Sequence, residues 1–298
     1  MKPFCAAVDW GTSSFRLWLL DRDGSILAER RGTEGMMAAR DTGFAAILES
    51  GLAEIGGTSD LPVIVCGMAG AKQGWVEAPY LDTPADLVAL AKRAVAPTDT
   101  GREVRILPGI AQRDPLRPDV MRGEETQLLG LVTEGSPSGL ICLPGTHSKW
   151  AILREGRVES FSTFMTGEMF AALSVHTILK LSTEGEAAPG DPAFLAAVRE
   201  AAGSPAAIAN QLFAIRAGAL LGFPARSAAG LSGALIGLEL AGVRTLHGDS
   251  REVTLVSAGR LGDLYHAALT HLGFGVRPVD AETLVRRGLL SAALAIWG

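Results

Sequence analysis

One pattern of strand, turn and strand occurs twice in this chain, and no other feature of the sequence restricts the fold as strongly. Each copy has an apolar run, a Gly-Thr turn, a second apolar run and a charged turn that contains glycine. The first copy spans residues 6–28 and the second spans residues 140–158, so the Gly-Thr pairs lie almost half a chain length apart. A unit repeated at this spacing predicts two related lobes, each built around the same hairpin.

The two Gly-Thr turns are suited to binding phosphate. Glycine lets the backbone turn tightly and approach a ligand closely, and successive backbone N–H groups form a concave anion site. Side-chain hydroxyls and a basic residue beside each turn add further donors. Ordinary glycine turns between strands are the alternative, but two copies at this spacing favour phosphate binding. The residues that we expect to face phosphates are Gly11, Thr12, Ser13 and Arg16 in the first copy, and Gly145, Thr146, His147, Ser148 and Lys149 in the second.

Asp9 ends the first apolar run, directly before the first Gly-Thr turn. A carboxylate in this place can hold Mg²⁺, directly or through water, when the cation also bridges phosphates. Aspartate also caps turns through its side chain, which is the alternative. With two phosphate-binding turns in the chain, we expect Asp9 to be a magnesium ligand.

Composition excludes several classes of protein. The chain has 298 residues, enough for two domains, and is 48% hydrophobic, which predicts well-formed cores. A net charge of −5 with no basic block argues against nucleic-acid binding. We find no apolar run of membrane-spanning length and no signal peptide, so we expect a cytoplasmic protein without a membrane partner. Cys5, Cys66 and Cys142 each lie in an apolar run and are expected to be small core residues.

Strand-like and helical runs alternate along the chain, which indicates α/β layers. A cluster of turn-forming residues, 134–139, precedes the second hairpin and predicts a first lobe of residues 1–138 and a second of residues 139–298. Residues 84–96 and 281–297 are expected to be helices, and the sequence does not decide on which lobe the last helix packs. It also leaves the oligomeric state open, with a homodimer as one candidate. P-loop and Rossmann fingerprints are both absent from the sequence.

Longer strings of residues carry a family resemblance. The duplicated hairpin, with Asp9 closing its first strand, resembles the two phosphate loops of the sugar kinase/actin/Hsp70 superfamily, and residues 253–262 resemble its adenosine loop. The strings VDWGTS, CGMAG, MRGEETQ, LPGTHSKW and TFMTGE resemble the 2-dehydro-3-deoxygalactonokinase (2-keto-3-deoxy-galactonate kinase) family. The match runs from residue 4 to about residue 170 and continues weakly beyond it, and MRGEETQ and LPGTHSKW are its most specific parts.

The resemblance implies a two-lobed actin-like ATPase (ribonuclease H-like) α/β fold with a central nucleotide cleft. It also implies ATP and Mg²⁺ as cofactors, with Ser257 and Gly259 in the adenosine loop.

Transfer of a phosphoryl group to a sugar hydroxyl needs a carboxylate near the acceptor oxygen. The second Gly-Thr turn contains no aspartate, so the base must lie elsewhere. Glu124 and Glu125 open a helix that the resemblance places near the γ-phosphate, and Glu168 opens another. Because acidic residues also favour helix N-termini for electrostatic reasons, a purely structural role is a strong alternative. We expect one of the two adjacent glutamates, preferably Glu124, to be the catalytic base.

The acceptor site is expected to follow the strand that ends at Gly67. A carboxylated sugar needs backbone N–H groups, hydroxyls or an arginine. For the two aromatic residues of this set, loop packing is as good an explanation as ligand contact. The candidate substrate-binding residues are Gly67, Met68, Gly70, Trp75, Tyr80, Arg122 and Thr166.

The function that the resemblance implies is ATP-dependent phosphorylation of 2-dehydro-3-deoxy-D-galactonate at its 6-hydroxyl, in galactonate catabolism. Other functions remain open on the sequence. The same fold could serve a phosphatase or nucleotide hydrolase, a kinase of another keto-deoxy sugar acid, or a non-enzymatic actin-like module gated by nucleotide. A pocket for a carboxylated sugar in the segment 67–80 would favour the kinase.

Overall fold

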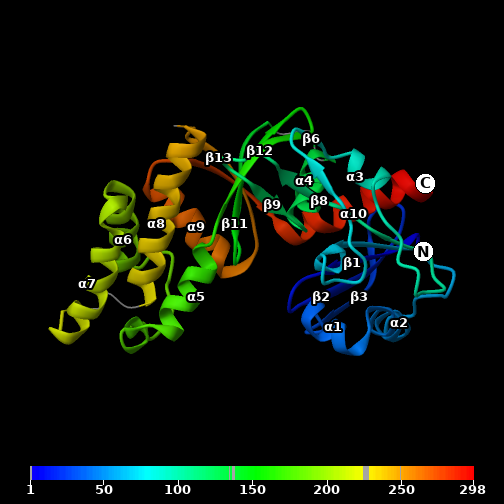
Figure 1. Cartoon of the computed structure of the whole chain (residues 1–298), viewed down its shortest axis with the longest axis horizontal. Coiled ribbons are helices and arrows are strands. Elements are labelled where there is room, and N and C mark those ends of the chain that lie inside the picture. The colour runs from blue at the N-terminus through cyan, green and yellow to red at the C-terminus, as the bar shows by residue number, and fades with distance from the viewer. Residues whose placement is uncertain (1, 134, 136–137, 224–227, 249) are drawn as a thin grey trace. The chain divides into compact units, whose positions relative to one another are not determined.

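The computed structural model describes residues 2–133, 135, 138–223, 228–248 and 250–298 (Figure 1). The chain forms two compact units. Unit 1 comprises Met1–Ser138, Leu153–Ser160 and Ala281–Gly298, and unit 2 comprises Gly139–Ile152 and Phe161–Asp280. The chain first passes from unit 1 to unit 2 after Ser138, at the expected boundary. The two units are not two consecutive halves, however, because residues 153–160 and 281–298 belong to unit 1. Of the expected linker 134–139, residues 134, 136 and 137 lie outside the described residues.

Unit 1 contains a five-stranded sheet of order β3-β2-β1-β4-β7. The first hairpin supplies β1, β2 and β3 as an antiparallel meander, and β4 and β7 extend the sheet in parallel from β1. Every residue of β4 is buried, as expected for a central parallel strand covered on both faces. The strands are Cys5–Trp10 (β1), Phe15–Leu20 (β2), Ile26–Gly32 (β3), Val63–Gly67 (β4) and Val104–Ile106 (β7).

The last helix packs on unit 1. Helix α10 lies against α4, and glycines permit the close approach: a Cβ added at Gly130 would overlap the carbonyl oxygen of Leu284, and one at Gly288 would overlap that of Thr126. The question that the sequence left open is therefore answered in favour of the first lobe. The helices of this unit are Met36–Thr42 (α1), Phe44–Glu54 (α2), Ala89–Lys92 (α3), Glu124–Thr133 (α4) and Ala281–Trp297 (α10), with a 3₁₀ turn at Met68–Gly70 (η1).

The prediction of a helix at residues 84–96 is wrong. The chain forms instead a short strand that pairs with the start of β12, followed by the single turn of α3. Val95 then exchanges backbone hydrogen bonds with Ile106, so tertiary pairing takes up backbone groups that a helix would have used. The remaining strands associated with this unit are Tyr80–Asp82 (β5), Ala85–Asp86 (β6), Gly109–Gln112 (β8) and Asp119–Met121 (β9), of which β5, β8 and β9 form a small sheet.

Unit 2 repeats the strand order of unit 1. Its six-stranded sheet runs β14-β13-β10-β11-β12-β6, and the first five strands correspond to those of unit 1. Because β10–β13 and β13–β14 are parallel, the second hairpin occupies the same topological place as the first. The duplication seen in the sequence is thus a duplication of topology. The strands are Gly139–Leu143 (β10), Ser148–Arg154 (β11), Arg157–Phe164 (β12), Glu252–Ser257 (β13) and Gly275–Asp280 (β14), where β11 and β12 also contribute residues to unit 1.

Helix α8 is the central helix of unit 2. By length and composition alone it could cross a membrane, but 61% of its 18-residue apolar segment is buried inside the protein. Its glycines let α6 approach closely, because a Cβ at Gly233 or Gly237 would overlap backbone carbonyls of α6. The helices are Thr166–His176 (α5), Pro192–Gly203 (α6), Ile208–Leu220 (α7), Ala228–His247 (α8) and Gly259–His271 (α9), with 3₁₀ turns at Ile178–Leu181 (η2) and Pro205–Ala207 (η3).

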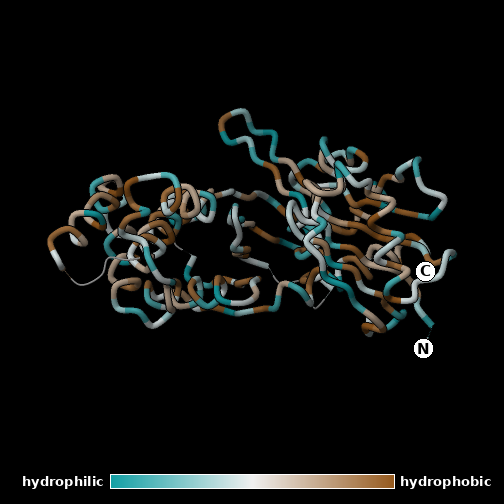
Figure 2. Tube along the Cα trace, turned by 90° about the horizontal axis from the view of Figure 1, so that it is seen from below, coloured by the Kyte–Doolittle hydropathy of each residue, from teal (hydrophilic) through white to brown (hydrophobic). Residues whose placement is uncertain are grey.

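Each unit has its own hydrophobic core. Trp10, Phe15 and Leu48 belong to that of unit 1, and Trp150 and Phe194 to that of unit 2. In Figure 2 brown apolar segments alternate with teal ones along the chain, and the apolar strands β1 and β4 are buried at every residue except Asp9. All three cysteines are free and buried, as the sequence predicted.

Candidate active site

The first Gly-Thr turn connects β1 to β2 in unit 1. The Gly11 amide donates to the Ser14 carbonyl at 2.9 Å, which closes the turn, while Thr12 and Ser13 are exposed. The Met36 amide at the start of α1 donates to the Gly11 carbonyl at 2.9 Å, so α1 holds the turn from one side. The turn therefore presents two free hydroxyl side chains on a fixed backbone.

Asp9 lies on β1 at the base of this turn. Its Oδ2 is 3.8 Å from Arg16 Nη1 on β2, and its Oδ1 accepts a weak bond from Cys66 Sγ at 3.8 Å on the neighbouring β4. Burial raises the pKa of Asp9, and the Arg16 charge opposes that rise.

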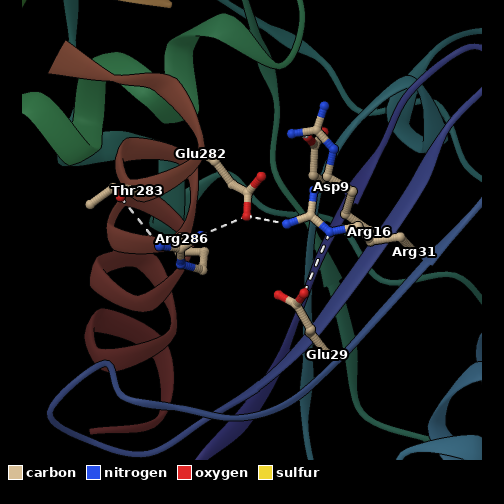
Figure 3. Close-up of polar contacts among 7 residues, drawn as sticks. All are labelled: Asp9, Arg16, Glu29, Arg31, Glu282, Thr283 and Arg286. Carbon is tan, nitrogen blue, oxygen red and sulfur yellow. Dashed lines mark hydrogen bonds and ion pairs between the residues drawn. The ribbon is translucent and has the colours of Figure 1, made fainter. Parts of the chain in front are cut away.

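Helix α10 contributes charged side chains to the surroundings of Asp9 (Figure 3). Glu282 at its first turn binds Arg31 Nη2 at 2.5 Å and Arg286 Nη1 at 3.0 Å, and Arg31 also contacts Glu29 at 3.5 Å. Glu282 raises the pKa of Asp9 slightly further, after the larger effects of burial, Arg16 and Cys66. The last helix thus takes part in the electrostatics of the first phosphate turn.

The adjacent glutamates of the MRGEET string face different environments. Glu125 is fully buried, and its carboxylate accepts the Gly123 amide at 2.9 and 2.7 Å and the Thr126 hydroxyl at 3.2 Å. Burial, and next the Glu124 charge, raise the pKa of Glu125 to about 8. Glu124 is half-buried, and its carboxylate accepts the Arg122 amide at 3.1 Å. Of the two, Glu124 is the one that a solvent-borne ligand can reach.

Arg122 is a partly buried cation beside Tyr80. Its guanidinium lies 4.4 Å from the centre of the Tyr80 ring, and its Nη2 donates to the Ala78 carbonyl at 2.9 Å. Its Nε and Nη1 are buried without a hydrogen-bond partner in the described part of the chain. Gly70 leaves room for it, because a Cβ there would lie 2.8 Å from Nη1. Unsatisfied arginine donors are costly unless an anion uses them.

Trp75 is partly buried and packs against the core of unit 1. Its ring stacks on Phe44 with centroids 5.9 Å apart, and its Nε1 donates to Asp99 at 2.7 Å. The expectation that Trp75 contacts substrate is therefore not supported by its position, because both its ring face and its donor are in use. Gly67, with φ +87°, ends β4, and the 3₁₀ turn that begins at Met68 follows it directly.

The second Gly-Thr turn connects β10 to β11 in unit 2. Thr146 and His147 are exposed, and His147 Nε2 lies 2.5 Å from Glu168 Oε2. The Glu168 amide donates to the Thr146 carbonyl at 3.0 Å, and Gly167 packs so closely that a Cβ there would meet the Gly145 carbonyl at 2.6 Å. The N-terminus of α5 therefore abuts this turn.

Three expected ligand residues of unit 2 are buried instead. Ser148 is fully buried and bonded to Tyr265, Lys149 is 6% exposed, and Thr166 donates to Glu239. Strand β11 begins at Ser148, so the side chains of Ser148 and Lys149 belong to the packed interior and not to the exposed turn, whereas Thr166 lies at the start of α5. The Ser148 hydroxyl is therefore turned toward Tyr265 and away from solvent, and its expected contact with phosphate stays a prediction.

Sequence reasoning missed Glu239, which gathers several of these buried groups. It is 1% exposed on α8 and accepts hydrogen bonds from Trp150, Thr166 and Tyr265. The available signal was a single carboxylate in the middle of a mainly apolar run of α8.

A cavity of about 410 Å³ opens beside the second Gly-Thr turn. It lies among the start of α5, the middle of α8 and the first turns of α9, with Arg260 at its edge hydrogen-bonded to the Ala187 carbonyl. Ser257 and Gly259, expected in an adenosine loop, line a separate cavity of about 480 Å³ at the ends of β13 and β14. The lining residues of the first cavity are Gly145, Thr166, Gly167, Phe170, Gly185, Glu186, Ala187, Ser232, Leu235, Ile236, Arg260, Leu261, Leu264 and Tyr265.

Two units with the same strand order, each with a Gly-Thr turn at the same place, define the class: the chain has the actin-like ATPase fold of the sugar kinase superfamily. The dehydratase activator from Clostridium difficile with bound ADPNP matches with a TM-score of 0.51 at 12% identity, covering 98% of this chain and 94% of that one. Component A of the Acidaminococcus fermentans (R)-2-hydroxyglutaryl-CoA dehydratase matches with a TM-score of 0.55 at 10% identity over the whole of both chains. At these identities the likeness concerns the fold alone.

The family is narrower than the fold. The 2-keto-3-deoxy-galactonokinase model matches residues 9–292. The Escherichia coli (strain K12) 2-dehydro-3-deoxygalactonokinase is 34% identical over 297 residues, 97% of each chain. A Sinorhizobium meliloti crystal structure, provisionally described as a 2-dehydro-3-deoxygalactonokinase, is 54% identical, with a TM-score of 0.95 over 99% of each chain. This chain therefore belongs to the 2-keto-3-deoxy-galactonokinase family, and the resemblance seen in the sequence is confirmed.

Proposed function

We propose that this protein transfers the γ-phosphoryl group of ATP to the 6-hydroxyl of 2-dehydro-3-deoxy-D-galactonate, in galactonate catabolism. The observation that carries the proposal is the pair of exposed Gly-Thr turns at equivalent places in two sheets, in a chain that belongs to this kinase family over residues 9–292. Backbone amides in such turns bind phosphate oxygens without any specialised side chain.

On the nucleotide side, the exposed backbone of Gly145, Thr146 and His147 would bind phosphate oxygens. The cavity beside this turn is lined mainly by apolar side chains of α8 and α9, which suits the base of a nucleotide. Ser257 and Gly259 would lie on the other side of the start of α9. In unit 1, Gly11, Thr12, Ser13 and Arg16 would bind the transferred phosphate.

Asp9 fits the role of a magnesium ligand. Mg²⁺ usually keeps several waters and binds one or two carboxylates together with substrate phosphates. Across the residues that the structure describes, no cluster of three or more His, Cys, Asp or Glu side chains could hold a metal alone. Asp9 would therefore hold the cation as a single carboxylate, together with the ATP phosphates. The cation would neutralise charge that develops on the transferred group.

On the acceptor side, Arg122 is the strongest candidate. Its unpaired Nε and Nη1 supply two donors of the kind that a carboxylate binds best, and the Tyr80 ring holds the guanidinium from one face. The backbone that follows β4, at Gly67, Met68 and Gly70, would add amide donors. We propose that these groups bind the carboxylate of the sugar acid.

Glu124 is the proposed general base. It is half-buried at the start of α4, two residues from Arg122, whereas the carboxylate of Glu125 is turned inward onto the Gly123 amide. The Glu124 carboxylate would accept the proton of the 6-hydroxyl as that oxygen attacks the γ-phosphorus. Glu168, which is paired with His147, is the second candidate.

A cytoplasmic location and a homodimeric assembly also belong to the proposal. The burial of α8 bears only on the membrane: a helix that packs in the core of its own unit is not available to lipid.

An assay of ADP release coupled to NADH oxidation tests the proposed function. The acceptors are 2-dehydro-3-deoxy-D-galactonate, its C4 epimer, and galactonate, which lacks the keto group. A reaction without any acceptor is the control. We expect ADP release only with the keto-deoxy acids, highest kcat/KM for the galactonate epimer, and a 6-phosphate product by ³¹P NMR. ADP release that is independent of acceptor would favour a nucleotide hydrolase instead.

A further inference from the structure

A buried carboxylate on α8 connects to the second Gly-Thr turn through hydrogen bonds. Glu239 is 1% exposed and is the one acidic residue of α8. Its Oε1 accepts Trp150 Nε1 at 2.7 Å, and its Oε2 accepts the Tyr265 hydroxyl at 2.7 Å and the Thr166 hydroxyl. The Ser148 and Tyr265 hydroxyls are also bonded to each other, at 2.7 Å.

The direction of each bond follows from the chemistry of the donors. The Trp150 indole can only donate. Because the Tyr265 proton is committed to Glu239, Ser148 donates to the Tyr265 oxygen. Three protons, from Trp150, Tyr265 and Thr166, then point toward the Glu239 carboxylate, and the Ser148 proton points toward the Tyr265 oxygen. An amide at position 239 would place its NH₂ against hydroxyls that need an acceptor.

The donors belong to the elements that enclose the second Gly-Thr turn. Ser148 and Trp150 open β11, directly after the turn, and Thr166 opens α5. Gly167, next to Thr166, packs against the Gly145 carbonyl and the Thr146 backbone. Tyr265 comes from α9 and lines the adjacent cavity together with Thr166. A single carboxylate therefore joins the strand after the turn, the helix that abuts it and a wall of the cavity.

We infer that Glu239 is a positioning residue for ATP: it fixes the backbone of Gly145–His147 against α5 and α9, in the geometry that the ATP phosphates require. This inference rests on the proposed function, in which that turn binds phosphate. Glu239 does not touch the nucleotide itself.

Stability alone does not account for a carboxylate at this place. Burying a charge costs several kcal/mol, and apolar residues of similar volume often stabilise a core as well or better. Burial raises the pKa of Glu239, while the bonds from Thr166, Trp150 and Tyr265 oppose that rise. What a carboxylate adds is direction, since its lone pairs set where three donors from three elements must lie.

Steady-state kinetics of Glu239→Gln test the role, with Val243→Ala as the matched control. Val243 lies one turn further along α8, is 1% exposed and belongs to the same core, so its truncation destabilises the unit without removing a hydrogen bond. We expect Glu239→Gln to lower kcat/KM for ATP on the order of 10- to 100-fold, because small displacements of binding groups are that costly. KM for the sugar acid should stay within about twofold, since its proposed site is in unit 1.

Hydrogen exchange supplies the readout that an ordinary core substitution would not reproduce. Residues 144–150 and 165–170 should exchange faster in Glu239→Gln than in Val243→Ala at equal unfolding free energy. Tyr265→Phe, which removes one donor and leaves the ring, should show the same effects more weakly. It replaces Glu239→Gln as the test variant if that protein does not fold. Wild-type protein without acceptor-dependent ADP release would refute the proposed function itself. Unchanged kcat/KM for ATP in a folded variant of an active enzyme would refute only the positioning role.

Discussion

Two adjacent glutamates show how far helix geometry separates neighbouring side chains. Consecutive helical residues project about 100° apart, and at the start of α4 this turns Glu125 into the interior and leaves Glu124 half-buried. The buried member closes the turn at Gly123, whose φ of +111° is one that side chains other than glycine rarely adopt. The two glutamates therefore differ in their chemistry, although they are identical and adjacent in the sequence.

Replacement of each glutamate by glutamine separates the two roles. Glu124→Gln should lower kcat by roughly 10²–10⁴-fold with little change in ATP affinity, because it removes a general base. Glu125→Gln should keep kcat near the wild-type value, since its carboxylate is bonded to the Gly123 amide. ATP affinity by calorimetry and kcat from ADP release check both. Full activity in both variants would make Glu168 the first candidate.

The pH dependence of stability reports on Glu125. Its pKa is about 8 in the folded protein against 4.5 ordinarily, under the influence of burial, the Glu124 charge and the opposing Arg122 charge. A raised folded pKa contributes stability that is complete below pH 4.5 and is lost as the pH rises through 8. The free energy of unfolding should therefore fall across this window, and Glu125→Gln should remove much of the fall.

Urea denaturation at half-unit steps between pH 4.5 and 8.5 measures this window. Glu77→Gln, an exposed carboxylate of the same unit, is the control and should follow the wild-type curve. Parallel curves for wild type and Glu125→Gln would show that Glu125 titrates at its ordinary pKa.

Asp9→Asn tests the proposed magnesium ligand. The substitution is expected to lower kcat by about 10²-fold or more at saturating Mg²⁺, because a charge that stabilises the transition state is lost. The fold should persist, since burial already raises the pKa of this carboxyl and a neutral amide has nearly the same shape. Asp23→Asn, in the exposed turn after β2, is the control. Wild-type turnover in Asp9→Asn would exclude Asp9 from the site.

At the scale of elements, the contact between α4 and α10 depends on glycine. The backbone of each helix lies directly on a glycine of the other, at Gly130 and Gly288. Any larger residue at these two positions would force the helix axes apart. This contact attaches the C-terminal helix to the helix that carries Glu124 and Glu125. It also sets Glu282 among the charges around Asp9.

Gly288→Ala should destabilise the protein by about 1–3 kcal/mol, as expected for overpacking. Gly218→Ala is the matched control: it is also a helical glycine, in α7, but a Cβ there would meet nothing within 4 Å. That substitution should be neutral or stabilise by up to about 1 kcal/mol, because alanine favours helix. Urea midpoints of the two variants decide. Equal stability of the two variants would contradict the close contact.

The element scale also shows where sequence patterns fail. Strand β4 and helix α4 were predictable, because β4 is a short continuous apolar run that ends at a glycine and α4 begins with two glutamates after a glycine. Residues 84–96 looked helical by composition, yet Val95 pairs with Ile106 and only Ala89–Lys92 are helical. Non-local pairing overrode local propensity there, and a single sequence carries no record of that competition.

At the scale of the whole molecule, phosphoryl transfer requires both ligands on one protein. The proposed sugar-acid site is in unit 1 and the proposed nucleotide site is in unit 2, while the reacting atoms must come within about 3–3.5 Å. We therefore expect the radius of gyration from small-angle X-ray scattering to decrease when a non-hydrolysable ATP analogue and the sugar acid are added together. Each ligand alone should have a smaller effect. One radius of gyration under all four conditions would contradict this expectation.

The sequence by itself determined the duplicated hairpin, the α/β class, the family and the exposed Gly-Thr turns. These follow from local patterns, because strands, tight turns and strings such as LPGTHSKW are written in consecutive residues. Only the tertiary structure decided that Ala281–Trp297 packs on unit 1, that Trp75 stacks on Phe44 while Ser148 is buried, and that Glu239 collects three donors. Those facts depend on which distant elements pack together, and packing is settled by shape and by satisfied hydrogen bonds that no local pattern specifies.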